Sequence, residues 1–111
     1  MKTNADLKLP EAPTLADLQA YVKEMEPVRG FSGQNALEKC LMLGEEVGEL
    51  FKAVRKSQGI GVDHQNSHLT EVSEELADVL IFLLSIANRY GVDLEQAFRE
   101  KETINKQRKW E

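Results

Sequence analysis

Three glutamates lie within five positions of the segment Leu43–Leu50, a spacing that places all three on one face of a helix. At about 100° per residue, Glu49 projects between Glu45 and Glu46. Glu46 and Glu49 are three positions apart, so both carboxylates can reach one ligand. Neighbouring like charges destabilise a helix slightly, and no basic residue lies among these three. The grouping of these three glutamates therefore indicates a functional role rather than a contribution to helix stability.

A second acidic pair, Glu75 and Asp78, has the same three-residue spacing in the next long helical segment. Two unit charges about 5 Å apart repel by roughly 3 kcal/mol at an effective dielectric constant near 20. Four ionised carboxylates without a cation would cost on the order of 10 kcal/mol, comparable to the stability of a domain. We therefore expect the two helices to face each other and to hold divalent cations between four or five carboxylates.

The ligand types indicate which cation. The two helices offer oxygen ligands and neither histidine nor cysteine at ligand spacing, which favours Mg²⁺, with Mn²⁺ as a possible substitute, over Zn²⁺. The Glu-x-x-His pairs of a di-iron bundle are missing from them. Magnesium usually completes its shell with water and substrate phosphate, so an open acidic site implies a polyphosphate ligand. The alternative is a charge-rich helix surface that binds no metal.

The pattern of apolar residues predicts an all-α protein whose helices position these acids. Thr14 and Asp17 form a capping-box signal, and Pro27, Gly30 and Gly33 indicate a loop that carries Arg29 and Phe31. Gly91 and Asp93 predict the end of the third helix and the start of the fourth. The expected helices span about residues 15–25, 34–57, 70–90 and 94–109, with a polar loop over about 58–69.

The third of these segments is apolar on nearly every side between Val79 and Ala87. A helix of that kind is surrounded by protein, and four helices of one small chain rarely surround anything completely. We expect a four-helix bundle-like subunit that is completed by oligomerisation. Cys40 lies on the apolar side of the second helix, so it is expected to be a buried structural thiol.

Length and composition limit the class of protein. The 111 residues predict a flexible arm at 1–13 and one domain at 14–111. A formal net charge of -5 argues against nucleic acid as a partner. One cysteine excludes an intrachain disulfide and a thiolate zinc site. The longest apolar run, Val79 to Leu84, is far shorter than the roughly 20 residues that cross a bilayer, so we expect a cytoplasmic protein without membrane partners.

Glu45-Glu46-x-x-Glu49, followed after a gap by Glu75-x-x-Asp78, resembles the signature of MazG-like nucleoside triphosphate pyrophosphohydrolases. The flanking segments LGEEVGELFKAVRK and EELADVLIFLLSIANRYGVDLEQAFREKETINKQRKW resemble the family too. Lys101-x-x-x-Asn105-x-x-Arg108 is similar to its C-terminal signature. The resemblance covers about residues 30–110, and the three blocks together are fairly specific.

The resemblance implies an all-α fold in dimers or tetramers whose active site is completed by helices from two chains. It implies magnesium-dependent cleavage of (deoxy)nucleoside triphosphates into a monophosphate and pyrophosphate, for nucleotide-pool house-cleaning. By motif position, Glu46, Glu49, Glu75 and Asp78 would bind metal. Glu45 would orient or deprotonate water or join the metal shell, so Glu45 and Glu46 are both candidate catalytic residues.

Outside the acidic group, the candidate nucleotide-binding residues each have a structural alternative. Lys101, Asn105 and Arg108 share one face of the fourth helix and could bind phosphate, Arg108 in bidentate fashion, or form a solvated basic face. Phe31 could stack on a nucleobase or be buried against the bundle. Asn88 could read a base or cap a neighbouring group.

His64 and His68 are loop residues to which the sequence assigns no role. Two other functions stay open. One is a sister all-α enzyme, a dimeric dUTPase or a phosphoribosyl-ATP pyrophosphohydrolase. The other is a non-catalytic module that senses nucleotides through the same acidic residues.

Overall fold

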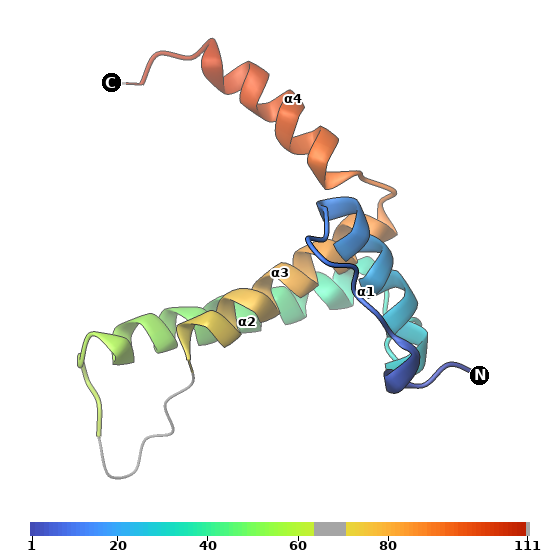
Figure 1. The fold of residues 1–111 in the computed structure, drawn as a ribbon. Helices are drawn as coiled ribbons and strands as arrows, with labels where there is room; N and C mark the ends of the chain where they lie inside the picture. Colours follow the sequence, from blue (N-terminus) through green and yellow to red (C-terminus); the bar gives the residue numbers. More distant parts are fainter. Residues whose placement is uncertain (64–70, 111) are drawn as a thin grey trace. The chain divides into compact units, whose positions relative to one another are not determined.

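The computed structural model describes residues 1–63 and 71–110 and is built from helices (Figure 1). They are the 3₁₀ turn η1 (Asn4–Asp6) and the α-helices α1 (Leu15–Arg29), α2 (Ala36–Ser57), α3 (Val72–Arg89) and α4 (Leu94–Lys106). No strand occurs in these described ranges, which confirms the predicted all-α class. Within them, no helix is both long and apolar enough to cross a membrane.

Side-chain caps set where three of the helices begin. The Thr14 hydroxyl accepts from the amide of Asp17, and the Asp17 carboxylate accepts from the amide of Thr14, as the capping-box signal predicts. Asn35 and Glu38 form the same reciprocal box at the start of α2, a cap that the sequence reading overlooked. Asp93 opens α4 as predicted, because its carboxylate accepts from the amide of Gln96.

Helix α3 ends at a Schellman motif. The amide of Val92 donates to the carbonyl of Ala87 at 2.9 Å, and the amide of Gly91 donates to the carbonyl of Asn88 at 3.3 Å. Gly91 has φ +64°, a conformation that a residue with a side chain rarely adopts. The predicted C-cap at Gly91 is therefore confirmed.

Two predicted helix ends are wrong. Helix α1 continues through Pro27 to Arg29, although an interior proline loses one backbone hydrogen bond and crowds the preceding turn. The helix ends one turn later at Gly30, whose φ of +78° is typical of a helix C-terminus. Helix α4 ends at Lys106 rather than 109, because its last turn tightens into i→i+3 bonds, with the amide of Arg108 donating to the carbonyl of Asn105 at 3.1 Å.

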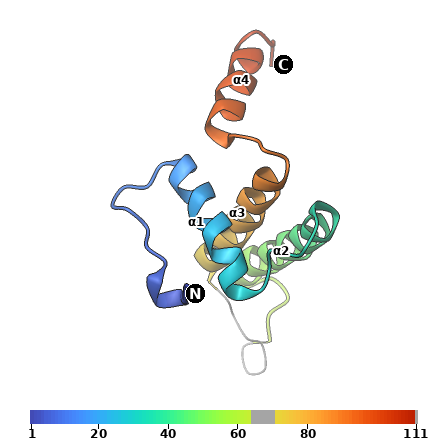
Figure 2. The same cartoon turned by 90° about the vertical axis from the view of Figure 1, so that its right-hand side faces the viewer.

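The chain forms two compact units, to both of which α3 contributes. The first contains residues 1–34 and the described residues from Leu84 onward. Its core is Leu7, Val22, Met25 and Leu84, with Leu18, Tyr21, Val28 and Leu94 packed around it. The 3₁₀ turn η1 lies beside α1, where the Arg29 side chain donates to Asn4 at 3.0 Å (Figure 2). Leu7 is thus part of the core, while the flexibility of residues 1–13 stays a prediction.

The second unit contains residues 35–83 apart from the undescribed residues 64–70. Helix α2 and the first part of α3 run side by side in opposite directions (Figure 1). On α2 only Lys39 and Ala53 are buried. Cys40 is exposed, so its predicted burial is wrong. Large apolar side chains of α2 are exposed as well, namely Leu37, Leu41 and Phe51.

Candidate metal centre

Three carboxylates converge between α2 and α3. Glu46 from α2 and Glu75 and Asp78 from α3 each offer one oxygen, and these three oxygens lie within 4.8 Å of one another. The antiparallel arrangement of α2 and α3 explains why these three carboxylates lie close together (Figure 1). Lys39 lies over the ring of Phe82, with its Nζ 5.2 Å from the centroid. Seven residues, about two helical turns, bring each helix back to the same face, so Glu46 meets Glu75 on the same seam.

The electrostatics of this group are unfavourable without a cation. Glu75 is buried, Glu46 is half-buried and Asp78 is exposed. Burial raises the pKa of Glu46 above its ordinary value, and the negative charges of Asp78, Glu75, Glu49 and Glu45 raise it further. No ion pair joins Glu46, Glu75 or Asp78 to any lysine or arginine of the described chain.

The donor set fits a hard divalent cation. It consists of carboxylate oxygens, which magnesium and manganese prefer, and it contains no imidazole or thiolate for zinc. Each pair of ionised carboxylates at this spacing repels by roughly 3 kcal/mol at an effective dielectric constant near 20. A bound cation would turn that repulsion into attraction, and this would stabilise the convergence of the three carboxylates.

Glu45 and Glu49 lie outside the group of three. Both are exposed on α2, and both act on Glu46 through their charge. Their roles at the metal and the attacking water stay predictions. The structure thus brings together three of the four predicted metal ligands.

The predicted phosphate-binding residues do not all lie on one helix. Lys101 is exposed on α4, and Asn105 is half-buried, with an Oδ1 atom that has no hydrogen-bond partner among the described residues. Arg108 lies beyond the end of α4, with its guanidinium 4.8 Å from the centroid of the Trp110 ring. The predicted three-residue strip on one helical face is therefore wrong for Arg108, and phosphate binding by all three stays a prediction.

Asn88 takes the second of its two predicted roles, because it bonds a neighbouring group. Its Nδ2 donates to the carbonyl of Gln19 at 2.9 Å, and its Oδ1 accepts from Gln19 Nε2 at 3.3 Å. Gln19 also donates to the carbonyl of Val92 and accepts from the amide of Leu94. These bonds tie α1 to the turn between α3 and α4. His64 and His68 lie outside the described residues.

A buried polar cluster that the sequence reading missed lies between α1 and the end of α3. The two carboxylate oxygens of Glu26 accept from Arg89 Nη1 at 3.0 Å and Nη2 at 2.7 Å. The Ser85 hydroxyl donates to both oxygens of Glu26 at 3.2 Å. The available signal was Ser85 and Arg89, four residues apart within an apolar helix, which require a polar partner.

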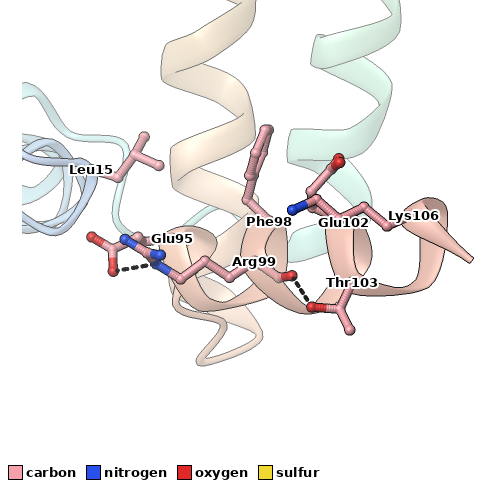
Figure 3. Close-up of a pocket in the computed structure, with 7 residues that line it drawn as sticks. All are labelled: Leu15, Glu95, Phe98, Arg99, Glu102, Thr103 and Lys106. Carbon is pink, nitrogen blue, oxygen red and sulfur yellow. Dashed lines mark hydrogen bonds and ion pairs between the residues drawn. The ribbon is translucent and has the colours of Figure 1, made fainter.

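An open cavity of about 450 Å³ lies between the start of α1 and α4 (Figure 3). Leu15 and Phe98 give it an apolar wall, and charged residues surround it, including the ion pair of Arg99 with Glu95 at 3.3 Å. None of the predicted site residues lines it. The cavity is therefore separate from the acidic centre.

Comparisons with known proteins agree with the geometry. Residues 34–109 match the family model described as the MazG nucleotide pyrophosphohydrolase domain. The chain is 33% identical over 95 residues to a dATP/dGTP diphosphohydrolase of Cyanophage S-2L. The aligned region covers 86% of this chain and 72% of that protein. It is 34% identical over 92 residues to the uncharacterised protein YvdC of Bacillus subtilis, covering 77% and 86%. It also matches rat dCTP pyrophosphatase 1, at 32% identity over 100 residues, and spans 59% of that protein.

Solved structures of MazG-like proteins also match this chain. The structure of the Cyanophage S-2L MazG-like pyrophosphohydrolase, bound to dGDP and three catalytic Mn²⁺ ions per active site, matches with a TM-score of 0.67 and 30% identity over 92% of this chain and 87% of that one. The iMazG protein from Vibrio DAT 722 matches with a TM-score of 0.61 and 33% identity, covering 84% and 98%. The family resemblance read from the sequence is confirmed.

Proposed function

The chain belongs to the MazG nucleotide pyrophosphohydrolase family, and on this premise we propose that it is a magnesium-dependent enzyme of nucleotide metabolism. It hydrolyses (deoxy)nucleoside triphosphates between the α- and β-phosphates and releases a monophosphate and pyrophosphate. One observation carries the proposal. Three carboxylates from two helices converge within 4.8 Å, and no basic side chain of the described residues neutralises them.

Glu46, Glu75 and Asp78, joined by Glu49, would hold Mg²⁺, with Mn²⁺ as a possible substitute. Such an ion lowers the pKa of bound water and draws charge from the phosphates. The Cyanophage S-2L relative binds Mn²⁺, which prefers the same oxygen ligands. That shared preference supports a hard cation at this site.

The reaction needs a group that receives the proton of the attacking water. The water oxygen bonds to the α-phosphorus, the bond to the oxygen that bridges to the β-phosphorus breaks, and pyrophosphate leaves. A base accepts that proton most readily when its pKa approaches the working pH. Glu45 and Glu46, neighbours on α2, are the two candidates for this role.

Lys101, Asn105 and Arg108 would neutralise the phosphates of the substrate, and Phe31 would stack on its base. Lys101 and Arg108 are exposed, and the Phe31 side chain is partly exposed, so all three are accessible to a ligand. Two relatives are named for different bases, dATP/dGTP and dCTP. We therefore propose (deoxy)nucleoside triphosphates as a class rather than one base.

We also propose that the enzyme works in the cytoplasm as a homodimer or homotetramer. Large apolar side chains of α3 and α4 are exposed in the single chain, with Leu76 at 53%, Leu83 at 43% and Phe98 at 70%. Leu76 and Leu83 lie seven residues apart on one face of α3, and an exposed apolar face of a helix is typical of a surface that packs against another chain. Light scattering should report a dimer or larger, and a clean monomer at micromolar concentration would refute the assembly.

Product analysis tests the function. The purified protein is incubated with magnesium and each of the common nucleoside triphosphates, several damaged ones and phosphoribosyl-ATP, and products are resolved by chromatography. We expect monophosphate and pyrophosphate, lost on adding EDTA and in Glu46→Gln. Diphosphate and phosphate would show that a different bond is cut. Turnover of dUTP alone or of phosphoribosyl-ATP would favour a sister enzyme, and no turnover of any substrate would favour the sensing module.

A further inference from the structure

The four-residue turn Phe31–Gln34 after α1 is held at its backbone by groups outside the turn. The amide of Phe31 donates to the carbonyl of Glu26 at 2.8 Å, and the amide of Gln34 closes the turn by donating to the carbonyl of Phe31 at 3.2 Å. Arg89 of α3 donates from Nη2 to the carbonyl of Phe31 at 3.2 Å and from Nε to the carbonyl of Gln34 at 2.7 Å. The first and the last carbonyl of the turn therefore bind one guanidinium group.

Further hydrogen bonds hold that guanidinium group in one orientation. Its two Nη atoms bond both carboxylate oxygens of Glu26 in a bidentate pair, and Nη1 also donates to the Ser85 hydroxyl at 2.6 Å. The side chains of Arg89 and Glu26 are only 16% and 6% exposed. One edge of the planar guanidinium group is thus bound to Glu26 of α1, and hydrogens on Nε and Nη2 point to the carbonyls of the turn.

A buried ion pair is a costly way to join two helices, since a well-packed apolar pair often stabilises as much. What an apolar pair lacks is a set of donors for the two carbonyls of the turn. The specific contribution of the Glu26–Arg89 pair is therefore to the backbone of Phe31–Gln34. Phe31 stands at the first position of that turn, and its side chain is 39% exposed.

We propose that Arg89, held by Glu26, is a positioning residue for nucleobase binding, because it fixes the Phe31–Gln34 turn and with it the ring of Phe31. The inference rests on the proposed function, since the base belongs to the nucleotide of that reaction. An aromatic ring on an ordered backbone binds a base without first losing conformational freedom. Arg89 itself makes no contact with substrate in this account.

A positioning role of this kind changes binding more than chemistry. Stacking on the base is the same in the ground state and the transition state, so its loss raises KM and leaves kcat unchanged. Arg89→Lys keeps the positive charge for Glu26, but one ammonium group cannot bond both carboxylate oxygens and both carbonyls. We expect Arg89→Lys to raise KM for a deoxynucleoside triphosphate about tenfold, and Phe31→Leu to do the same.

The experiment compares wild type, Arg89→Lys, Phe31→Leu and the double variant on two substrates, the best deoxynucleoside triphosphate and an abasic deoxyribose triphosphate. Arg99→Lys is the matched control, because Arg99 forms an exposed ion pair with Glu95 in the same unit. The proposal predicts that the double variant is no worse than Phe31→Leu alone and that KM for the abasic substrate is unchanged.

Three results would overturn the proposal: multiplicative effects in the double variant, an equal loss on the abasic substrate, or a fall in kcat at constant KM. Calorimetric Kd values for a non-hydrolysable α,β-imido analogue are measured in parallel. If the wild type turns over no substrate, the proposed function fails, and the same pattern in Kd still decides this inference. Should Arg89→Lys not fold, Glu26→Gln replaces it with the same decisive outcomes.

Discussion

Helix α3 carries two charged clusters, and they differ in where the opposite charge comes from. Near its C-terminal end, Arg89 neutralises Glu26 through two hydrogen bonds, and Ser85 completes the group. Near its N-terminal end, Glu75 and Asp78 meet another carboxylate, Glu46, without a cation from the described residues. In the first cluster the opposite charge comes from an arginine of the protein, and in the second it has to come from an ion in solution.

This difference separates a charged group that the protein neutralises itself from one that requires a cation. Folding can tolerate buried charges when they are paired and hydrogen-bonded, as Glu26 and Arg89 are. Like charges that converge have no such compensation, and the pKa of Glu46 rises in response to burial and to the neighbouring carboxylates. The comparison predicts that substitutions in the two clusters affect different properties: stability and substrate binding at the Glu26–Arg89 cluster, and metal-dependent turnover at the acidic cluster.

The largest effect is expected for Glu46→Gln. The amide can neither accept the proton of the attacking water nor supply a charged metal ligand, so kcat should fall by about 10²- to 10⁴-fold. Steady-state kinetics with the best substrate measures this, while circular dichroism should show an unchanged helical content. Activity within about threefold of wild type would remove Glu46 from the catalytic group.

Arg89→Met should affect stability instead. The substitution removes the two charge-assisted hydrogen bonds from Arg89 to the buried Glu26 carboxylate, and the free energy of unfolding should fall by about 3 kcal/mol. Urea unfolding followed by circular dichroism measures the change. A loss below about 1 kcal/mol would show that the pair contributes little to folding.

A smaller effect should appear in the pH dependence of the metal-free protein. The pKa of Glu46 in the folded state is raised above its ordinary value of 4.5, first by burial and then by the neighbouring negative charges. Between these two pKa values the folded state binds more protons than the unfolded state, so stability should fall as pH rises through this window. The difference between wild type and Glu46→Gln, measured in EDTA, isolates this group. A difference that does not vary with pH would contradict it.

The smallest effect is expected at an exposed ion pair. Arg99 and Glu95 lie four residues apart on α4, 3.3 Å between charged atoms, with side chains 76% and 57% exposed. Arg99→Ala should therefore lower the free energy of unfolding by no more than about 0.5 kcal/mol. A loss as large as that of Arg89→Met would show that burial does not distinguish the two arginines.

Local sequence signals predicted the acidic centre and most helix limits. The caps at Thr14 and Asp93 depend only on residues three positions away. Glu75 and Asp78 are likewise three positions apart, and the repulsion between them and the glutamates of α2 indicated that both helices share a cation. Such short-range patterns can be read from the chain itself.

Features that depend on distant residues could not be read in this way. Helix α1 continues past Pro27 while Glu26, one residue earlier, bonds to Arg89, 63 residues further along the chain. Leu7 is buried by residues of α1 and α3. Cys40 follows the apolar pattern of α2 but is exposed, because hydrophobic periodicity shows which residues share a face and not how much of that face is covered.

Thermal unfolding with and without magnesium tests the central claim most directly, that the acidic cluster takes its counter-charge from a cation. Adding Mg²⁺ should raise the Tm of the wild type by several degrees, since an ion that binds only the folded state stabilises it. Glu75→Gln, which removes one of the three converging carboxylates, should abolish the rise. Glu74→Gln, a change in the exposed neighbour on α3, should keep it. An equal magnesium response in all three proteins would contradict the account.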